Sequence, residues 1–235
     1  MMRMLVSVRS VDEALLAARG GADFIDLKEP REGALGGLPV ETIAAIVRAL
    51  RERRSGLPVS ATIGDLGMSE LGEILARVDA VAACGVDYVK VGIERAPKAS
   101  AVLKALAATG HAVVPVFIAD RGLDSDCVAQ ACRLEFPALM VDTADKRAGS
   151  LFDVMTDTDL RRFVAQVRAS GALAGLAGAL RRSQLAGLQE LDPDFAGFRS
   201  AVCDGDRSGA LDPLRLEELA AALHKSRAGA AEPAT

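Results

Sequence analysis

The sequence contains no tryptophan, one tyrosine and two histidines, and aromatic residues make up only 3% of its 235 residues. A nucleic-acid-binding surface combines a basic cluster with aromatic side chains, and this chain has neither, with a formal net charge of −4. His111 and His224 are too few for a histidine-based metal site or proton relay. No hydrophobic run approaches the length of a membrane span, and no signal peptide precedes the first predicted strand. We therefore expect neither nucleic acid nor membrane as a partner.

The four cysteines also exclude a class of site. Cys84, Cys127, Cys132 and Cys203 lie at scattered spacings, without the CxxC pairs that are typical of zinc sites. We interpret them as reduced thiols of a cytoplasmic protein. We expect a protein without a metal ion or an organic cofactor.

What the chain has is a repeated alternation of strand-like and helix-like segments. Half of its residues are hydrophobic, mostly Ala, Val, Leu and Ile, which suits helices packed on parallel strands. We predict strands at 4–8, 23–28, 58–63, 87–92, 112–118, 138–142, 172–177 and 195–199. Helices are predicted at 11–19, 39–54, 69–84, 97–109, 124–135, 156–170, 181–190 and 212–224.

Eight strands that alternate strictly with eight helices imply a parallel sheet, which normally closes into a (β/α)8 TIM barrel. A doubly wound open sheet is the alternative. It fits less well because no glycine-rich dinucleotide loop follows the first strand. We predict one catalytic domain over residues 1–225 and a disordered tail over 226–235.

The segment DFIDLK ends in a charged residue that a buried strand rarely carries. If it is a strand, Asp26 and Lys28 point to the same face, because side chains alternate. Buried charge is costly unless it is paired, and a buried lysine loses part of its affinity for a proton. A lysine that is neutral part of the time attacks carbonyl carbon, which indicates Schiff-base chemistry. A purely structural Asp26–Lys28 pair is the alternative.

The same arrangement recurs in DYVKVG, where Lys90 lies near the end of another predicted strand. Asp142 ends the sixth strand, and the active sites of such barrels lie at the carboxyl ends of the strands. We expect the two lysines to meet Asp26 and Asp142 there, one lysine as nucleophile and the other as proton carrier. A structural charge cluster is again the alternative. Lys146 lies on the following loop. It could bind a substrate phosphate or assist proton transfer, and a solvated charge is the alternative.

The loops after the seventh and eighth strands are the usual phosphate site of this fold. Gly178 and Ala179 follow the seventh strand, where small residues let backbone N–H groups approach an anion. Arg199, Ser200 and Ala201 follow the eighth, and the planar guanidinium of Arg199 could hold a phosphate. The glycines could equally make tight turns only.

Two further segments lie near the predicted site. Residues 29–37 form a charged, glycine-rich loop directly after Lys28, suited to covering a substrate. Ser60 and Thr62 share one face of the third strand and could donate hydrogen bonds to a hydroxyl or carbonyl group. Both segments could also be ordinary strand ends.

The motifs taken together resemble one family, the (5-formylfuran-3-yl)methyl phosphate synthases of methanofuran and methylofuran biosynthesis. The matching segments follow in order along nearly the whole chain, at GGAD (20–23), DLKEP (26–30), GALG (33–36), SATIGD (60–65), DYVKVG (87–92), DTA (142–144) with Lys146, LFD (151–153), AGLAG (174–178), Arg199, Cys203 and GDR (205–207). The resemblance implies a (β/α)8 barrel of the class I aldolase type.

The resemblance also implies an activity and its residues. The family condenses two molecules of glyceraldehyde 3-phosphate into a furan aldehyde phosphate, with loss of phosphate and water. Its Schiff-base lysine falls on Lys28 and its proton-accepting lysine on Lys90. Its acidic residues fall on Asp26 and Asp142, and its further lysine on Lys146. The implied partner is therefore a small triose phosphate, and we expect a homo-oligomer that serves one-carbon metabolism.

Two positions depart from the family pattern, which has Asn in place of Glu29 and Ser in place of Ala179. Both departures concern the positioning of the substrate, because every catalytic side chain is present. Two other functions fit the residues as well. One is a class I aldolase that acts on another phosphosugar, and the other is a non-catalytic barrel that binds a phosphosugar.

Overall fold

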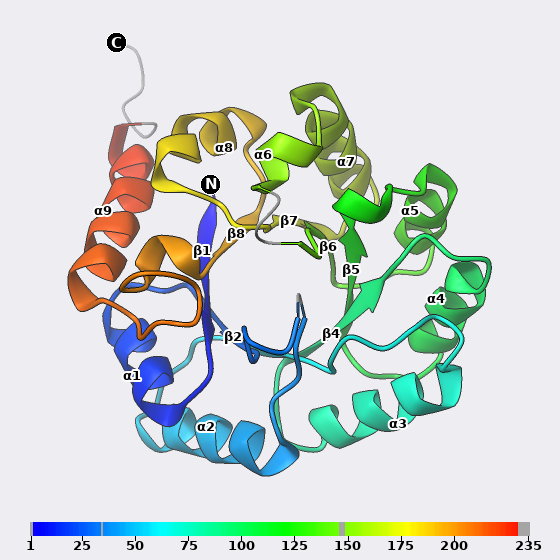
Figure 1. Cartoon of the computed structure of the whole chain (residues 1–235), viewed down its shortest axis with the longest axis horizontal. Coiled ribbons are helices and arrows are strands. Elements are labelled where there is room, and N and C mark those ends of the chain that lie inside the picture. Colours follow the sequence, from blue (N-terminus) through cyan, green and yellow to red (C-terminus); the bar gives the residue numbers. More distant parts are fainter. Residues whose placement is uncertain (1, 34, 146–148, 230–235) are drawn as a thin grey trace.

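The computed structural model describes residues 2–33, 35–145 and 149–229, the last five of them by their backbone alone. Within these residues, eight parallel strands follow one another around a closed barrel, and helices surround it (Figure 1). The strands are β1 (Arg3–Val8), β2 (Phe24–Leu27), β3 (Val59–Thr62), β4 (Tyr88–Ile93), β5 (Val113–Ile118), β6 (Ala138–Asp142), β7 (Leu173–Leu176) and β8 (Phe195–Phe198). The predicted (β/α)8 barrel is confirmed, and each strand lies within two residues of its predicted bounds.

The helices follow the strands as predicted, with some differences at their ends. They are α1 (Val11–Arg19), α2 (Val40–Glu52), α3 (Leu71–Ala82), α4 (Ala99–Ala107), α5 (Ser125–Cys132), α6 (Leu151–Val154), α7 (Asp157–Ala169), α8 (Leu185–Leu191) and α9 (Pro213–Gly229), with 3-10 turns η1 (Ala119–Arg121), η2 (Arg182–Gln184) and η3 (Ser200–Val202). Neither the single-turn helix α6 nor the 3-10 turns were predicted. A segment of three or four residues is too short to show a helical period.

Side-chain caps explain where several helices begin. Ser10, Asp124 and Thr156 each accept a hydrogen bond from a backbone N–H group in the first turn of α1, α5 and α7. Such a cap satisfies a donor that has no partner within the helix. Ser69 was expected to begin α3, but the helix begins two residues later, after Glu70.

The last helix extends beyond the predicted end of the domain. α9 continues to Gly229, four residues into the segment 226–235 that was expected to be disordered. Residues 230–235 lie outside the described residues. None of the helices in the described part of the chain is both long and apolar enough to cross a membrane.

Two separate apolar clusters stabilise the barrel. The outer core fills the space between the strands and the surrounding helices, and the inner core fills the barrel itself. Phe24 and Phe195 pack in the inner core with ring centroids 5.5 Å apart. Gly175 is required beside them, because a Cβ there would lie 2.4 Å from the Phe195 ring. The inner core fills the barrel below the carboxyl ends of the strands.

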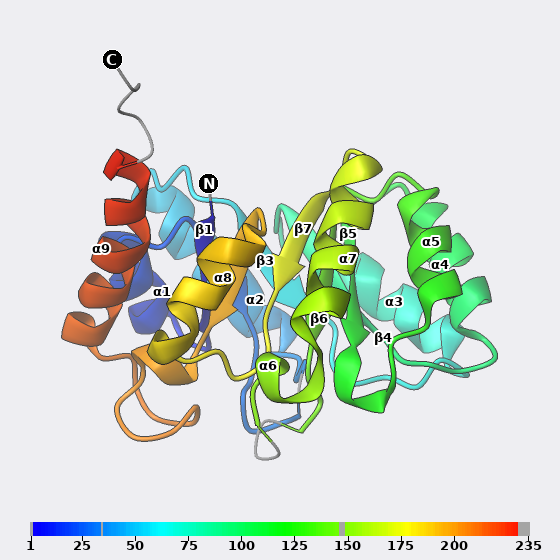
Figure 2. The same cartoon turned by 90° about the horizontal axis from the view of Figure 1, so that it is seen from above.

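The loops after the strands make up the carboxyl end of the barrel. Figure 2 shows the loop after β2 and the loop between β8 and α9 on the same side of the barrel. Both follow the carboxyl ends of their strands, as the parallel topology requires. Polar side chains that the strands point inward at this end therefore meet under these loops.

Candidate active site

Asp26 is the most deeply placed charged residue of the barrel, and its neighbours are set by strand register. Ser7 of β1 and Ser60 of β3 lie directly beside it. Their hydroxyl groups donate hydrogen bonds to the two carboxylate oxygens of Asp26, at 3.0 and 2.7 Å. Lys90 Nζ donates to Asp26 Oδ1 at 3.0 Å. The carboxylate is fully buried, yet each of its oxygens has at least one donor.

These donors determine the charge of the carboxylate. Burial by itself raises the pKa of the Asp26 carboxyl group. The ammonium groups of Lys90 and Lys28 and the hydrogen bond from Ser60 outweigh that effect, so the pKa of Asp26 lies below its usual value. Asp26 is therefore a fixed negative charge that faces two lysines.

Lys28 and Asp142 form a second, looser pair. Lys28 Nζ lies 3.8 Å from Asp142 Oδ2, and both side chains are almost completely buried. The backbone N–H of Thr143 donates to Asp142 Oδ1 at 2.7 Å, which fixes the carboxylate. The predicted meeting of both lysines with Asp26 and Asp142 is therefore present in the structure. The remaining predicted catalytic residue, Lys146, lies outside the described residues.

A cavity opens above these two pairs, with about 420 Å³ of empty space when the solvent at its mouth is included. The predicted site residues on its wall are Lys28, Lys90, Asp26, Asp142, Gly178, Ala179, Arg199 and Ser200. Ala201 was predicted to bind phosphate, but it packs against the outer core instead of lining the cavity. An amine, a carboxylate and a second amine that face one enclosed space can attack a carbonyl carbon and move protons beside it.

The loop after β7 presents backbone to the cavity. Gly178 has φ +118° and Ala179 has φ +45°, so two consecutive residues adopt positive φ. A Cβ at Gly178 would lie 3.0 Å from the Thr143 side chain, which explains the glycine. Within the described residues, the N–H groups of Gly178 and Ala179 have no backbone or side-chain acceptor. They are available to an anion, as the sequence predicted for these positions.

Arg199 faces inward, but its guanidinium is fully used by the protein. Two N–H groups donate to the Glu13 carboxylate of α1 at 2.6 and 3.0 Å, and a third donates to the carbonyl of Ser7. The remaining two donate to the carbonyl groups of Arg207 and Gly209. Arg199 thus has no spare donor for a phosphate, and its predicted role as a clamp is not favoured by this arrangement.

Two polar residues that were not predicted as site residues also line the cavity. Ser7 occupies an inward position of β1, and the same alternation that identified Asp26 and Lys28 could have found it. Arg207 comes from the loop between β8 and α9, and its guanidinium donates to the carbonyl of Gly33 at 2.9 Å. No strand period reaches this loop, so the signal for Arg207 in the sequence was its place in the matching segment GDR (205–207).

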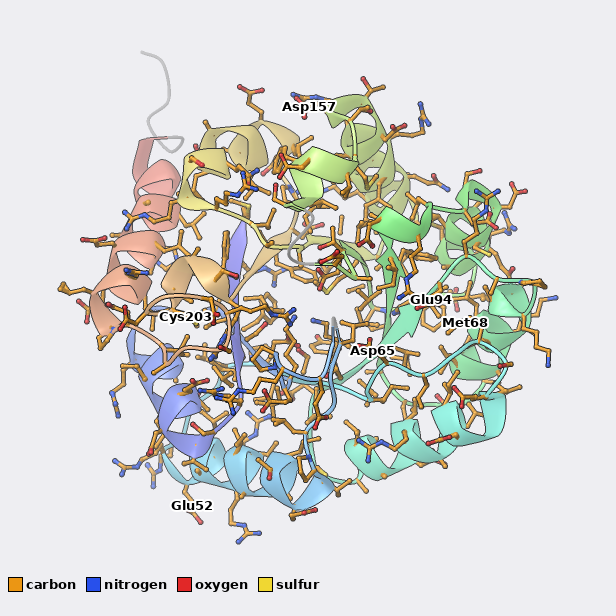
Figure 3. All side chains as sticks on the ribbon, viewed as in Figure 1. Glu52, Asp65, Met68, Glu94, Asp157 and Cys203 are labelled. Carbon is orange, nitrogen blue, oxygen red and sulfur yellow. The ribbon has the colours of Figure 1, made fainter. Side chains whose placement is uncertain are left out.

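The described residues of the loop 29–37, which are 29–33 and 35–37, lie over part of the barrel mouth, and their covering of a substrate stays a prediction. Leu35 is buried in the inner core, and its N–H donates to Asp65 Oδ1 at 3.1 Å. Figure 3 shows Asp65 beside this loop at the centre of the barrel. Thr62 Oγ1 donates to the carbonyl of Gly36 at 2.9 Å. Ser60 and Thr62 therefore hold Asp26 and the loop, instead of pointing free hydroxyl groups at a ligand.

Comparison with known proteins agrees with this geometry. Residues 4–220 match the family model of 4-HFC-P synthase. The chain belongs to the 4-HFC-P synthase family. Among its relatives, the (5-formylfuran-3-yl)methyl phosphate synthase of Methanopyrus kandleri is 36% identical over 237 residues, covering 94% of this chain and 98% of that protein. The enzyme of the same name from Archaeoglobus fulgidus is 35% identical over 240 residues, covering 95% and 100%.

A bacterial relative is similar to this 4-HFC-P synthase family member over the same range. A provisionally named (5-formylfuran-3-yl)methyl phosphate synthase of Methylorubrum extorquens is 39% identical over 228 residues, covering 97% of this chain and 92% of that protein. The resemblance predicted from the motifs is thus confirmed at the level of the family.

Solved structures agree on the fold alone. Phosphoribosyl anthranilate isomerase from Thermus thermophilus superimposes with a TM-score of 0.66 at 18% identity, covering 96% of this chain and all of that one. Thiamine phosphate pyrophosphorylase from Pyrococcus furiosus gives a TM-score of 0.64 at 16% identity, covering 95% and 96%. Both support the barrel of this 4-HFC-P synthase family member, and neither identity is high enough to carry a function.

Proposed function

We propose that this protein is a lyase-type synthase that condenses two molecules of glyceraldehyde 3-phosphate into (5-formylfuran-3-yl)methyl phosphate through a Schiff base on Lys28. Membership of the family supports the product. The chemistry rests mainly on one observation, the position of Lys28 on the cavity wall, 3.8 Å from Asp142 and only 6% exposed. An amine kept from bulk water is suited to attack a carbonyl carbon, and the carboxylate beside it holds it in position.

The first steps use both lysines. The ammonium group of Lys28 first gives its proton to water at the mouth of the cavity. The neutral amine then attacks the aldehyde carbon of one triose phosphate, and the oxygen leaves as water when the imine forms. Lys90 holds its proton in the pair with Asp26, at 3.0 Å, and can give it to the departing oxygen. The neutral amine of Lys90 is then ready to take a proton from the carbon next to the imine.

Removal of that proton leads to loss of phosphate. The electron pair of the broken C–H bond moves toward the imine, which acts as an electron sink, and the neighbouring C–O bond then breaks to release phosphate. Condensation with the second triose phosphate, ring closure and loss of water give the furan. Hydrolysis of the imine releases the product and restores the Lys28 amine.

Asp26 supports Lys90 in both of its states. Its pKa lies below the usual value, because the neighbouring lysines and Ser60 outweigh the effect of burial, so Asp26 remains a carboxylate at neutral pH. It therefore stabilises the ammonium that Lys90 becomes after it accepts a proton. Asp142 is placed to do the same for the protonated imine on Lys28.

Borohydride trapping tests the proposal. The protein is reduced in the presence of glyceraldehyde 3-phosphate and its peptides are mapped by mass spectrometry. A reduced adduct on Lys28 is expected. An unmodified Lys28, in protein shown separately to bind the substrate, would mean a binding barrel or a non-covalent mechanism.

Phosphate release separates the proposed synthase from an aldolase. Simple aldol chemistry with the same lysines releases no phosphate, whereas the proposed reaction releases one phosphate for each furan formed. A phosphate assay during turnover therefore distinguishes the two activities. The cytoplasmic location and the homo-oligomer stay predictions, and light scattering on the purified protein tests the second.

A further inference from the structure

Among the described residues, the cavity wall carries four cations, and three of them already have a carboxylate. Lys90 pairs with Asp26, Lys28 with Asp142 and Arg199 with Glu13. Within the residues that the structure describes, the fourth cation, Arg207, has no carboxylate oxygen within 4.0 Å. Its one hydrogen bond there is the contact with the carbonyl of Gly33, so most of its five N–H groups are available.

The loop that carries Arg207 is held in place by Arg199. The guanidinium of Arg199 donates to the carbonyl groups of Arg207 and Gly209, at 2.9 and 2.6 Å, while Glu13 fixes it from the other side. Gly209 is needed in this loop, because a Cβ there would lie 2.0 Å from the carbonyl oxygen of Asp204. One arginine thus builds the loop, and a second arginine on the same loop is presented to the cavity.

The position of Arg207 matches that of an anion-binding group. It lines the same cavity as Gly178 and Ala179, whose N–H groups have no acceptor in the described part of the chain. Burial and the neighbouring charge of Arg199 together lower the pKa of the Arg207 guanidinium, and the nearby Asp142, Asp65 and Glu29 only partly oppose this. A group that is buried with too little opposite charge gains from an incoming anion.

We propose that Arg207, together with the backbone of Gly178 and Ala179, binds the phosphate group of the triose phosphate whose carbonyl carbon reacts with Lys28. This assignment rests on the proposed function for the identity of the substrate. The phosphate-binding role predicted for Arg199 is thereby assigned to Arg207, because a planar guanidinium with available donors binds phosphate through two parallel hydrogen bonds. Arg199 is then a positioning residue.

Binding of glycerol 3-phosphate tests the assignment separately from catalysis. This probe carries the phosphate but has no carbonyl group, so it cannot form an imine. By titration calorimetry, Arg207→Gln should weaken its binding about 10- to 100-fold, since hydrogen bonds to charged groups contribute about 1.5–3 kcal/mol. Arg95→Gln is the matched control, because Arg95 is exposed and follows β4 at the same end of the barrel. It should change binding less than about twofold.

Two further measurements keep the test decisive. Phenylglyoxal modifies accessible arginines. In the unmutated protein, glycerol 3-phosphate should protect Arg207 but not Arg95 from this modification, and the experiment does not depend on a variant that folds. Borohydride trapping of unphosphorylated glyceraldehyde on Lys28 should proceed in Arg207→Gln as in the unmutated protein.

The outcomes separate this inference from the proposed function. Unchanged glycerol 3-phosphate binding in Arg207→Gln, or equal modification of Arg207 with and without the probe, would overturn it. Loss of binding in Arg207→Gln without any adduct on Lys28 would support the phosphate site and contradict the Schiff base. If Arg207→Gln does not fold, the protection experiment decides alone.

Discussion

The two lysine–aspartate pairs of the barrel differ in how firmly they are held. Lys90 and Asp26 lie within strands, 3.0 Å apart, and Asp26 also accepts hydrogen bonds from Ser7 and Ser60. Lys28 and Asp142 lie at strand ends, 3.8 Å apart. The firm pair is suited to hold and return a proton, and the looser pair leaves an amine able to move toward a substrate. In the proposed mechanism, packing thus separates the proton carrier from the nucleophile.

The largest effect is expected on activity, when the looser pair of Lys28 and Asp142 is broken. Lys28→Ala should lower kcat by about a thousandfold or more, because the covalent intermediate cannot form. Its free energy of unfolding should change by only about 1 kcal/mol, since Asp142 keeps the N–H of Thr143 and faces the cavity. Steady-state assays and urea unfolding measure the two quantities. Substantial residual turnover would contradict the role of Lys28.

Breaking the firm pair should instead lower stability. Lys90→Met removes the cation that lies 3.0 Å from a fully buried carboxylate, so the free energy of unfolding should fall by about 3–5 kcal/mol. Urea unfolding of Lys90→Met and Lys28→Ala side by side gives the comparison. Equal losses in both variants would mean that the two pairs are not held differently.

The pH dependence of stability should identify the firm pair. The pKa of Asp26 in the folded protein lies below its ordinary value of 3.8, because lysine charges and the hydrogen bond from Ser60 outweigh burial. Its carboxylate therefore stabilises the fold fully above that pH, and the contribution is lost as the pH falls through the folded-state pKa. The stability difference between the unmutated protein and Asp26→Asn should be constant from about pH 5 to 8 and shrink below about pH 4. Urea unfolding at several pH values checks this, and a difference that grows on acidification would contradict it.

A smaller effect on stability should come from Leu35, a residue of the loop 29–37. Leu35 packs against the inward face of β4, because a Cβ at Gly92 would be 2.9 Å from its Cδ1 atom. Leu35→Ala should cost about 2–3 kcal/mol of stability, because it leaves a cavity in the inner core. Gly92→Ala should cost about 1–3 kcal/mol by overpacking, but much less when Leu35→Ala is also present.

A double-mutant cycle measured by urea unfolding gives this coupling directly. If the costs of Leu35→Ala and Gly92→Ala simply add, the loop 29–37 does not cover β4 in solution.

The sequence allowed most of the barrel to be predicted, because strand alternation and helix caps are local signals. Alternation alone placed Asp26 and Lys28 on one face, and strand order brought Lys90 and Asp142 to the same end. The same rule would have added Ser7, which lies beside Asp26 in the register of β1 and β2. These residues were predictable because strands fix the direction of their side chains.

The roles of the two arginines could not be predicted in the same way. The guanidinium of Arg199 donates two hydrogen bonds to Glu13, which lies on the helix after β1, 186 positions away in the sequence. Only the closure of β8 against β1 brings them together, and no local pattern marks such a pair. Arg207 lies in a loop without a period, where the hydrogen bonds of neighbouring residues set the direction of its side chain.

The smallest expected effect lies beside the looser pair, at Ala179. Its φ of +45° is a conformation that costs alanine about 1 kcal/mol and glycine almost nothing. Ala179→Gly should therefore change the free energy of unfolding by less than about 1 kcal/mol, because relief of strain is offset by the greater freedom of glycine in the unfolded chain. Its backbone N–H, which is placed for a phosphate, is unchanged, so binding of glycerol 3-phosphate should stay within about twofold. Titration calorimetry measures the affinity, and a loss well beyond twofold in Ala179→Gly would contradict the assignment of the anion contact to the backbone at this position.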